Sequence, residues 1–423
     1  MIKQILGTAF SRTLITIIGV IILSLNTRYL GAEKLGELSL LLIALHLILQ
    51  VSELVGGAAL VYLQNKHKTN KLLSISYLWA FVVSAFAYLI IKLFFIEINL
   101  VFTITLCAFI QSLNHSHLHL LVGKEKIKYY NLSTVIQIGI VFILILFFYL
   151  FKGEATILVY LNIYLVGQLI TLFFTTYYLS GSIKIGGSPI FDKELVVDMY
   201  RYGFIIQLAN IFQFGVYRIN YIILEAFTSL STLGIYTLGN QLSEKALIPG
   251  KAISMVQYAK ISNIDDKNEA SELTIKLLTV SVIIGFFAAI ALIVIPEKLI
   301  SLLFGGDFGE AKSILVYLAP GVVFMSISTI YSHYFAGLGK YKLNTMVSFI
   351  GLLAIAALSY SLIPIYGMKG AALATSIVYL IQAFVQVQIF KKVSNLSWAQ
   401  IMDFHQQSLK NISFKEINNW INR

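Results

Sequence analysis

The sequence contains a single cysteine, Cys107, and only five prolines among its 423 residues. One cysteine excludes an intrachain disulfide and a cysteine-rich metal centre. Charged residues are also scarce: Asp, Glu, Lys and Arg make up 12% of the chain, against about 25% in soluble proteins. So little charge cannot cover a water-facing exterior, and we therefore expect most of the surface to face lipid.

Hydrophobic residues account for 58% of the chain, and the formal net charge is +11. In a soluble protein this basic excess would suggest a nucleic-acid partner. Here the basic residues fall mostly in short gaps between apolar runs, as membrane topology requires, so no nucleic acid is expected. The first apolar stretch is long and lacks a small-residue cleavage site, and we interpret it as a membrane helix rather than a signal peptide.

About 20 predominantly apolar residues are needed to cross a bilayer, and the sequence contains twelve such segments. They are residues 5–27, 37–63, 72–93, 98–121, 130–151, 157–180, 199–226, 232–258, 272–296, 311–336, 343–363 and 368–390. The expected fold class is thus an all-α polytopic membrane protein with about 12 transmembrane helices. The eighth segment departs most from a pure apolar run, because it contains Glu244, Lys245, Pro249 and Lys251.

Charge in the loops predicts the orientation of the chain. With the N-terminus in the cytoplasm, 18 of the 31 Lys and Arg residues fall on that side and 7 on the other. Since basic residues accumulate on the cytoplasmic side, we expect both termini to be cytoplasmic. Residues 181–198, rich in Gly and Ser, are expected to form a cytoplasmic linker. Residues 391–423 are expected to form a cytoplasmic amphipathic tail, either a surface helix or a frayed end.

Two pairs of segments indicate an internal repeat. "HSHLHLLVGKEKIK" (115–128) has five identities in fourteen with "YSHYFAGLGKYKLN" (331–344) at an offset of 216, and "LGELSL" (35–40) matches "LGIYTL" (233–238) at an offset of 198. Chance similarity of apolar sequence is the alternative. The repeat predicts two six-helix lobes in the same orientation, residues 1–180 and 199–390. Parallel repeats of this kind place a substrate site between the lobes, around a central cavity.

Polar residues within the apolar segments are candidates for lining that cavity, because ionisable groups at membrane depth usually face water or one another. The candidate cavity residues are Arg12, Gln50, Gln207, Asn210, Tyr217, Arg218, Glu244 and Lys251. Glu53 is a candidate for carrying a coupling proton or cation, or for pairing with an arginine. The alternative for the whole set is mutual pairing that holds helices together. Fixed arginines favour an anionic substrate such as a phosphate or diphosphate.

The stretch "HSHLHL" (115–120) resembles a metal site. On a helix, however, His115 and His119 share a face while His117 points about 200° away, so a three-histidine zinc site is excluded. The pair of histidines could still bind a metal, but no third ligand is evident nearby, and we expect no metal. For His117 we expect a packing or capping role. The nucleotide-binding, zinc-protease and nucleophile-elbow motifs are also missing, so no enzyme activity is expected.

Several stretches resemble one family. "TRYLGAEKLGELSLLLI" (27–43) is similar to the opening pattern of polysaccharide flippases, residues 199–262 to their seventh and eighth helices, and "IPIYGMKGAALAT" (363–375) to their C-terminal half. The chain thus resembles the O-antigen (Wzx-type) flippases of the multidrug/oligosaccharidyl-lipid/polysaccharide (MOP) exporter superfamily, along nearly its whole length. It departs from their pattern in its tyrosine-rich and asparagine-rich helices and its few prolines.

The resemblance implies a flippase that moves undecaprenyl-diphosphate-linked oligosaccharide units, of O-antigen (lipopolysaccharide) or capsule, across the bacterial cytoplasmic membrane by alternating access. It implies that Arg12 and Arg218 hold the diphosphate or acidic sugars, by their location in helices one and seven rather than by a sharp motif. We expect no cofactor, and transport could be coupled to a H⁺ or Na⁺ gradient. Polysaccharide polymerase machinery is a candidate partner. We expect the chain to act as a monomer. The alternatives are a multidrug exporter of organic cations and a membrane polymerase or ligase, the latter disfavoured by the lack of a large loop.

Overall fold

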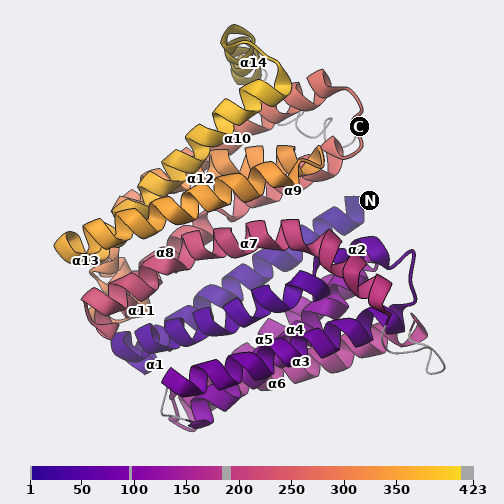
Figure 1. Cartoon of the computed structure of the whole chain (residues 1–423). Coiled ribbons are helices and arrows are strands. Elements are labelled where there is room, and N and C mark those ends of the chain that lie inside the picture. The colour runs from indigo at the N-terminus through magenta and orange to yellow at the C-terminus, as the bar shows by residue number, and fades with distance from the viewer. Residues whose placement is uncertain (1, 95–97, 183–191, 411–423) are drawn as a thin grey trace. The chain divides into compact units, whose positions relative to one another are not determined.

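The computed structural model describes residues 2–94, 98–182 and 192–410, and every regular element in these ranges is helical (Figure 1). The main helices are α1 (Ile2–Gly56), α2 (Ala58–Leu63), α3 (Thr69–Phe94), α4 (Ile98–Gly123), α5 (Ile127–Leu146), α6 (Ile157–Leu179), α7 (Lys193–Phe227), α8 (Leu230–Ala246), α9 (Ile248–Ile261), α10 (Lys267–Val294), α11 (Glu297–Phe304), α12 (Ala311–Gly337), α13 (Tyr341–Ser394) and α14 (Trp398–Lys410). The expected all-α fold is confirmed.

Eight segments within the described residues are long and apolar enough to cross a membrane. Two of them, Phe10–Leu63 and Tyr341–Ser394, have 54 residues each, enough for two crossings apiece. A glycine with positive φ interrupts each one: Gly31 has φ 78° and Gly367 has φ 55°. A side chain is strained in this left-handed region, so glycine at these positions lets the helix turn back. With α7 and the α8–α9 pair, the helices match the twelve expected spans.

The outer faces of the helices carry large apolar side chains that remain exposed among the described residues. On α3, Phe81 is 59% exposed, Phe86 63% and Leu93 82%. Leaving so many large apolar side chains exposed to water would be unfavourable, whereas lipid solvates them. The chain is therefore a multi-pass membrane protein.

Contacts divide the chain into two compact units. Unit 1 comprises the described residues up to Ile211 together with residues 230–234 and 302–308. Its helices α1, α3, α4, α5 and α6 pack around buried side chains that include Leu45, Ile104, Cys107 and Leu161. The boundary at Ile211 lies inside α7, so the first half of this long helix packs in unit 1.

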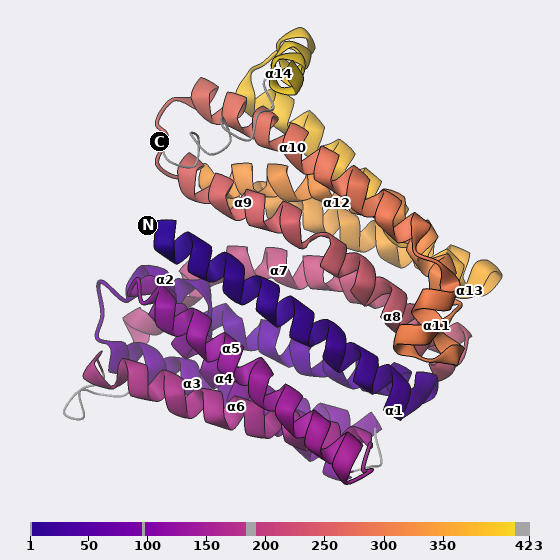
Figure 2. The ribbon, with the colours of Figure 1, turned by 180° about the vertical axis from the view of Figure 1, so that it is seen from behind.

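Unit 2 comprises residues 212–229, 235–301 and 309 onward. Helices α9, α10, α12 and α13 lie side by side around buried Tyr334, Phe335 and Phe390, and α14 lies against the end of α10, as both views show (Figure 2). Ile401 of α14 is 5% exposed, whereas its Met402 is 57% exposed. The expected tail thus contains an amphipathic helix over residues 398–410.

The lobe boundaries expected from the sequence stay a prediction. Within the expected linker, residues 183–191 lie outside the described residues, and so does the end of the tail from residue 411.

The internal repeat is visible in the turns that join equivalent helices. The turn after α4 places Glu125 at φ 57°, and the turn after α12 places Gly339 at φ 71°. The next turns contain Gly153 at φ 67° and Gly367 at φ 55°. Both pairs are 214 residues apart, and the closing hydrogen bonds repeat the same spacing: the amide of Lys126 donates to Leu121 and that of Lys340 to Phe335. Helices α4 and α12 therefore correspond, as expected.

The register of the repeat differs from the sequence alignment, which gave an offset of 216 and was wrong by two residues. The reason lies in the spacing of the matched residues. Lysines alternate at positions 124, 126 and 128 and again at 340 and 342, and histidines alternate at 115, 117 and 119. A pattern with a period of two matches itself after a shift of two. In the structural register His119 corresponds to His333, and His115 to Thr329.

Candidate functional site

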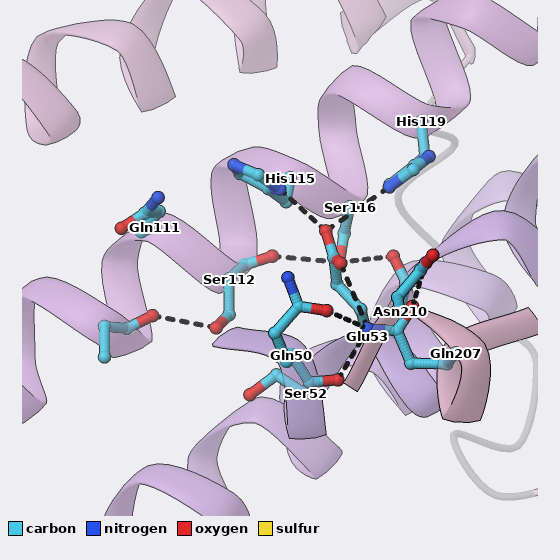
Figure 3. A network of polar contacts seen from close by, with 12 residues as sticks. Gln50, Ser52, Glu53, Gln111, Ser112, His115, Ser116, His119, Gln207 and Asn210 are labelled. Atoms are coloured by element: carbon cyan, nitrogen blue, oxygen red, sulfur yellow. Dashed lines mark hydrogen bonds and ion pairs between the residues drawn. The ribbon is translucent and has the colours of Figure 1, made fainter. Parts of the chain in front are cut away.

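A network of carboxylate, imidazole and amide side chains lies in unit 1, where the end of α1 meets α4 and the first half of α7 (Figure 3). Oε1 of Glu53 lies 2.7 Å from Nδ1 of His115 and 3.5 Å from Nε2 of His119. From α7, Nε2 of Gln207 donates to Oε1 of Gln50 at 2.6 Å and to Oε2 of Glu53 at 3.4 Å. Both oxygens of the carboxylate therefore have partners.

Asn210 extends this network by one turn of α7, because its Nδ2 donates to Oε1 of Gln207 at 3.1 Å. Four of the candidate residues from two apolar segments of the sequence, Gln50, Glu53, Gln207 and Asn210, are thus brought together. They are joined by hydrogen bonds between helices, as the pairing alternative anticipated. The coupling role of Glu53 stays a prediction.

Two small residues position the network. A Cβ on Gly56, at the end of α1, would lie 2.8 Å from Oγ of Ser116 on α4. A Cβ on Gly203 of α7 would lie 2.2 Å from the carbonyl oxygen of Leu54. The contact at Gly203 is with backbone and is too close for any larger residue, so this glycine allows α7 to approach the end of α1. A larger residue at Gly56 would force the Ser116 hydroxyl to rotate away. Gln207 lies one helical turn after Gly203 and is thereby held beside Gln50.

A second polar cluster lies in unit 2, between the second half of α7 and α8. Arg218 and Glu244 form a two-pronged ion pair, with Nη1 2.7 Å from Oε1 and Nη2 3.2 Å from Oε2. Nδ2 of Asn240 donates to Oε1 of Glu244 at 2.9 Å and to the hydroxyl of Tyr221 at 3.0 Å. The Arg218 guanidinium also lies over the Tyr221 ring, 5.3 Å from its centroid. The anionic group that faces Arg218 is therefore a residue of the chain, as the pairing alternative anticipated.

The ion pair is only partly covered, since the side chains of Arg218 and Glu244 are 23% and 28% exposed. The charges cancel within the pair, and the open edge of the guanidinium remains accessible to a competing anion. Neighbouring Tyr217 points elsewhere, its hydroxyl 4.0 Å from Sδ of Met325. Lys251, on α9, is exposed.

Arg12 lies on the exposed face of α1 in unit 1. Its Nη2 donates to the hydroxyl of Tyr130 at 3.1 Å, and its guanidinium carbon is 5.9 Å from the centre of that ring. A cation over a tyrosine ring is a favourable but weak contact at an exposed position. Arg12 and Arg218 fall in different contact units, and a single cavity shared by all the candidate residues stays a prediction.

The histidines of the HSHLHL stretch divide as helical geometry requires. His117 is 1% exposed and contacts Thr175, through Nδ1 at 2.9 Å, and the hydroxyl of Tyr77. This is the packing role expected for it. His115 and His119 lie on the opposite face, 31–34% exposed, beside Glu53. Sequence reasoning missed this third group because 62 residues separate it from His115.

Glu53, His115 and His119 are also the set that could hold a metal ion. Within the described part of the chain, they are the one group of three His, Cys, Asp or Glu side chains whose ligand atoms all lie within 4.8 Å of one another.

The fold is that of a known class of transporter. The chain superimposes on an inward-facing multidrug resistance MATE family transporter of the MOP superfamily with a TM-score of 0.69, at 14% identity, covering 94% of this chain and 96% of that one. An outward-facing MATE transporter gives a TM-score of 0.64 at 15% identity, covering 95% and 98%. The chain thus has the MOP exporter fold, with two six-helix lobes in parallel repeat.

Sequence comparison then identifies the family. The polysaccharide biosynthesis protein family matches residues 25–313, more than half of the chain, and the chain belongs to this family. A "Putative O-antigen transporter" of Shigella flexneri is 22% identical over 424 residues, covering 93% of this chain and 99% of that protein. The "Capsular polysaccharide biosynthesis protein CapF" of Staphylococcus aureus is 30% identical over 175 residues, covering 41% of this chain and only 44% of that protein. The expected Wzx-type flippase family is confirmed.

Proposed function

We propose that the chain is a flippase that moves undecaprenyl-diphosphate-linked oligosaccharide repeat units, of O-antigen or capsule, from the inner to the outer leaflet of the bacterial cytoplasmic membrane. Both termini are cytoplasmic, and the two lobes alternate between inward-open and outward-open states. Translocation breaks no covalent bond, so the chain is a transporter and not an enzyme. The observation that carries the proposal is the family match over residues 25–313.

The chemistry of the polar clusters supports a glycan substrate. Gln50, Gln207 and Asn210 present amides in unit 1, and Asn240 and Tyr221 present an amide and a hydroxyl in unit 2. Amides and hydroxyls both donate and accept hydrogen bonds, as sugar hydroxyls require. These groups already bond to one another, so a sugar would exchange one set of hydrogen bonds for another at small net cost.

Arg218 is the proposed contact of the diphosphate in unit 2. A guanidinium fork binds phosphate as well as carboxylate, so a diphosphate would compete with Glu244 for the same donors. The displaced Glu244 keeps the hydrogen bond from Asn240. We propose Arg12 as a second contact, because it is exposed and its guanidinium contacts the neutral ring and hydroxyl of Tyr130, which leave its charge uncompensated.

Export of organic cations is the second candidate, because the chain shares its fold with multidrug transporters. A cation site would need a carboxylate free of positive partners. Glu244 is paired with Arg218, whereas Glu53 lies against the imidazoles of His115 and His119 and accepts a hydrogen bond from the Gln207 amide. The clusters therefore favour the glycan.

The deciding experiment uses purified full-length protein in liposomes that contain a radiolabelled undecaprenyl-diphosphate oligosaccharide. A membrane-impermeant glycosidase added outside cleaves only outward-facing sugar. We expect protein-free vesicles to release about half of the label and protein-containing vesicles to approach complete release. If release stays at the protein-free level while the same vesicles accumulate ethidium against a proton gradient, the cation exporter replaces the flippase.

A further inference from the structure

We infer that Glu53, His115 and His119 form a binding site for Zn²⁺ that joins α1 to α4 within unit 1. Glu53 comes from the last turn of α1, and the two histidines lie one turn apart on the facing side of α4 (Figure 3). The proposal does not depend on glycan transport, and neither activity requires the other.

The geometry of the three ligand atoms matches a tetrahedral metal. Zinc–nitrogen and zinc–carboxylate bonds of roughly 2.0–2.2 Å place neighbouring ligand atoms about 3.4 Å apart. Oε1 of Glu53 lies 2.7 Å from Nδ1 of His115 and 3.5 Å from Nε2 of His119. Lengthening the His115 contact by about 0.7 Å, within the reach of side-chain rotation, would give the ligand spacing that one ion needs.

The donor set also selects the metal. Two imidazoles and one carboxylate, with the histidines four residues apart on one helical face, suit zinc. Magnesium and calcium prefer oxygen ligands and would gain little from the imidazoles. The fourth position would be taken by water, because the histidines are 31–34% exposed. A charged Zn²⁺ would also offset the negative charge of Glu53, which is 14% exposed.

The surroundings hold the ligands in place before any metal arrives. Gly56 of α1 and Ser116 of α4 are in contact and fix the spacing of the two helices. Gly56 lies three residues after Glu53, and Ser116 directly follows His115. The second carboxylate oxygen receives the amide of Gln207 at 3.4 Å. Such outer contacts orient a ligand, and their loss typically weakens metal binding about 10- to 100-fold.

The other repeat shows that the histidine pair is no general requirement of the fold. In unit 2 the positions equivalent to His115 and His119 are Thr329 and His333, and Nδ1 of His333 bonds to the carbonyl of Thr329 at 2.8 Å. A lone histidine bonded to its own helix suffices there for packing. The added histidine and the facing carboxylate are specific to unit 1.

The test is metal binding by the full-length protein, purified with a non-histidine tag and freed of metal with a chelator. Titration with Co²⁺ in place of zinc reports geometry, because tetrahedral Co²⁺ gives intense visible absorption. We expect one equivalent to bind per chain with this spectrum, Zn²⁺ to displace it, and Mg²⁺ in excess to leave it unchanged. Absence of saturable binding, or an octahedral spectrum, would overturn the site.

Variants assign the ligands. His119→Gln and Glu53→Gln should each weaken Zn²⁺ binding at least tenfold, and Gln207→Leu about tenfold, while His333→Ala, the matched control from the equivalent position, should bind as the parent does. Glutamine retains a hydrogen-bonding side chain, so His119→Gln and Glu53→Gln keep a polar contact between α1 and α4. A monodisperse elution profile confirms folding of each. Parental affinity in folded His119→Gln or Glu53→Gln protein would contradict the assignment.

Discussion

Gly36 on α1 and Gly234 on α8 face each other so closely that each helix occupies the space of the other's missing side chain. A Cβ on Gly36 would lie 2.0 Å from the carbonyl oxygen of Leu230, and a Cβ on Gly234 would lie 1.9 Å from that of Ala32. All four residues belong to unit 1. The two glycines are also the matched pair of the sequence repeat at an offset of 198, so equivalent positions of the two repeats meet in one reciprocal contact.

This contact predicts that Gly36→Ala will be poorly tolerated. The obstructing atoms are backbone atoms, which cannot rotate away, so α1 and α8 would have to separate. We expect a loss of roughly 1–3 kcal/mol or more, measured as a lower melting temperature of the detergent-solubilised protein.

Gly139→Ala, on α5, is the matched control, because, its own helix backbone aside, no atom of the described part of the chain lies within 4 Å of the added Cβ. Alanine is the better helix former by up to about 1 kcal/mol, so this variant should be as stable as the parent or more so. Equal melting temperatures for Gly36→Ala and Gly139→Ala would mean that the helices do not cross at this distance.

The membrane spans could be predicted from the sequence, and the contacts between them could not. An apolar run of about 20 residues is a local property that the bilayer itself selects. The meeting of Glu53 with His115 depends instead on the close approach of helices at Gly56, and the sequence around Gly56 carries no signal of its partner Ser116. The spacing of the histidines correctly predicted that His117 lies on the opposite face of the helix from His115 and His119, because this follows from helical geometry alone.

The ion pair of Arg218 with Glu244 lies between these cases. The sequence predicts both residues as cavity residues, with mutual pairing as the alternative. The partner of Arg218 could not be identified from the sequence, because α7 and α8 can meet in several registers and only side-chain packing decides between them.

The alignment of the two repeats was wrong by two residues for a related reason, since identities spaced by two residues fit equally well after a shift of two.

Asp192 predicts a dependence of stability on pH at the start of α7. The ion pair with Lys71, whose Nζ lies 3.0 Å from Oδ2, holds the pKa of the Asp192 carboxyl below its usual value, and the amide of Leu195 adds a hydrogen bond at 3.3 Å. Because this pKa is lower in the folded protein than in the unfolded one, ionised Asp192 contributes fully to the free energy of unfolding above the ordinary aspartate pKa of about 3.9. This contribution is lost as the pH falls through the pKa of Asp192 in the folded protein.

Asp192→Asn tests this, because asparagine still caps the helix but carries no charge. We expect the parent to melt at a higher temperature than the variant at about pH 6, and the difference to shrink as the pH falls below about 3.9, the ordinary pKa of an aspartate. A difference that persists unchanged at the lower pH would show that the ion pair is not its source.

His405 predicts that the tail helix α14 loosens in mild acid. Its Nδ1 lies 2.7 Å from Oγ1 of Thr279 on α10, and burial lowers the pKa of His405. The undocked helix then binds a proton more readily than the docked one. Docking is therefore fully stable above the ordinary pKa of about 6.5 and weakens as the pH falls below it.

A nitroxide at position 402, attached to Met402→Cys in a Cys107→Ala background, would report the docking of α14. We expect its mobility to rise between about pH 7.5 and pH 5.5, across the ordinary histidine pKa. His405→Gln keeps a hydrogen-bonding side chain that does not titrate, so its mobility should not change over this range. An equal rise in both proteins would assign the effect to another group.

The ion pair in unit 2 separates a structural role of Arg218 from a role in transport. Arg218→Ala leaves Glu244 about one-quarter exposed and without its partner, which should cost about 3 kcal/mol. Loss of surface polysaccharide in this variant would therefore be ambiguous.

The double variant Arg218→Gln/Glu244→Gln removes both charges, and we expect it to recover most of the melting temperature and the membrane level of the parent. If Arg218 contacts the diphosphate, the double variant should still lack surface polysaccharide. Glu244→Gln alone should retain it, because the glutamine oxygen still accepts a hydrogen bond from the guanidinium and the arginine charge remains. Full polysaccharide on cells that carry the double variant would make the pair a structural link between α7 and α8 and nothing more.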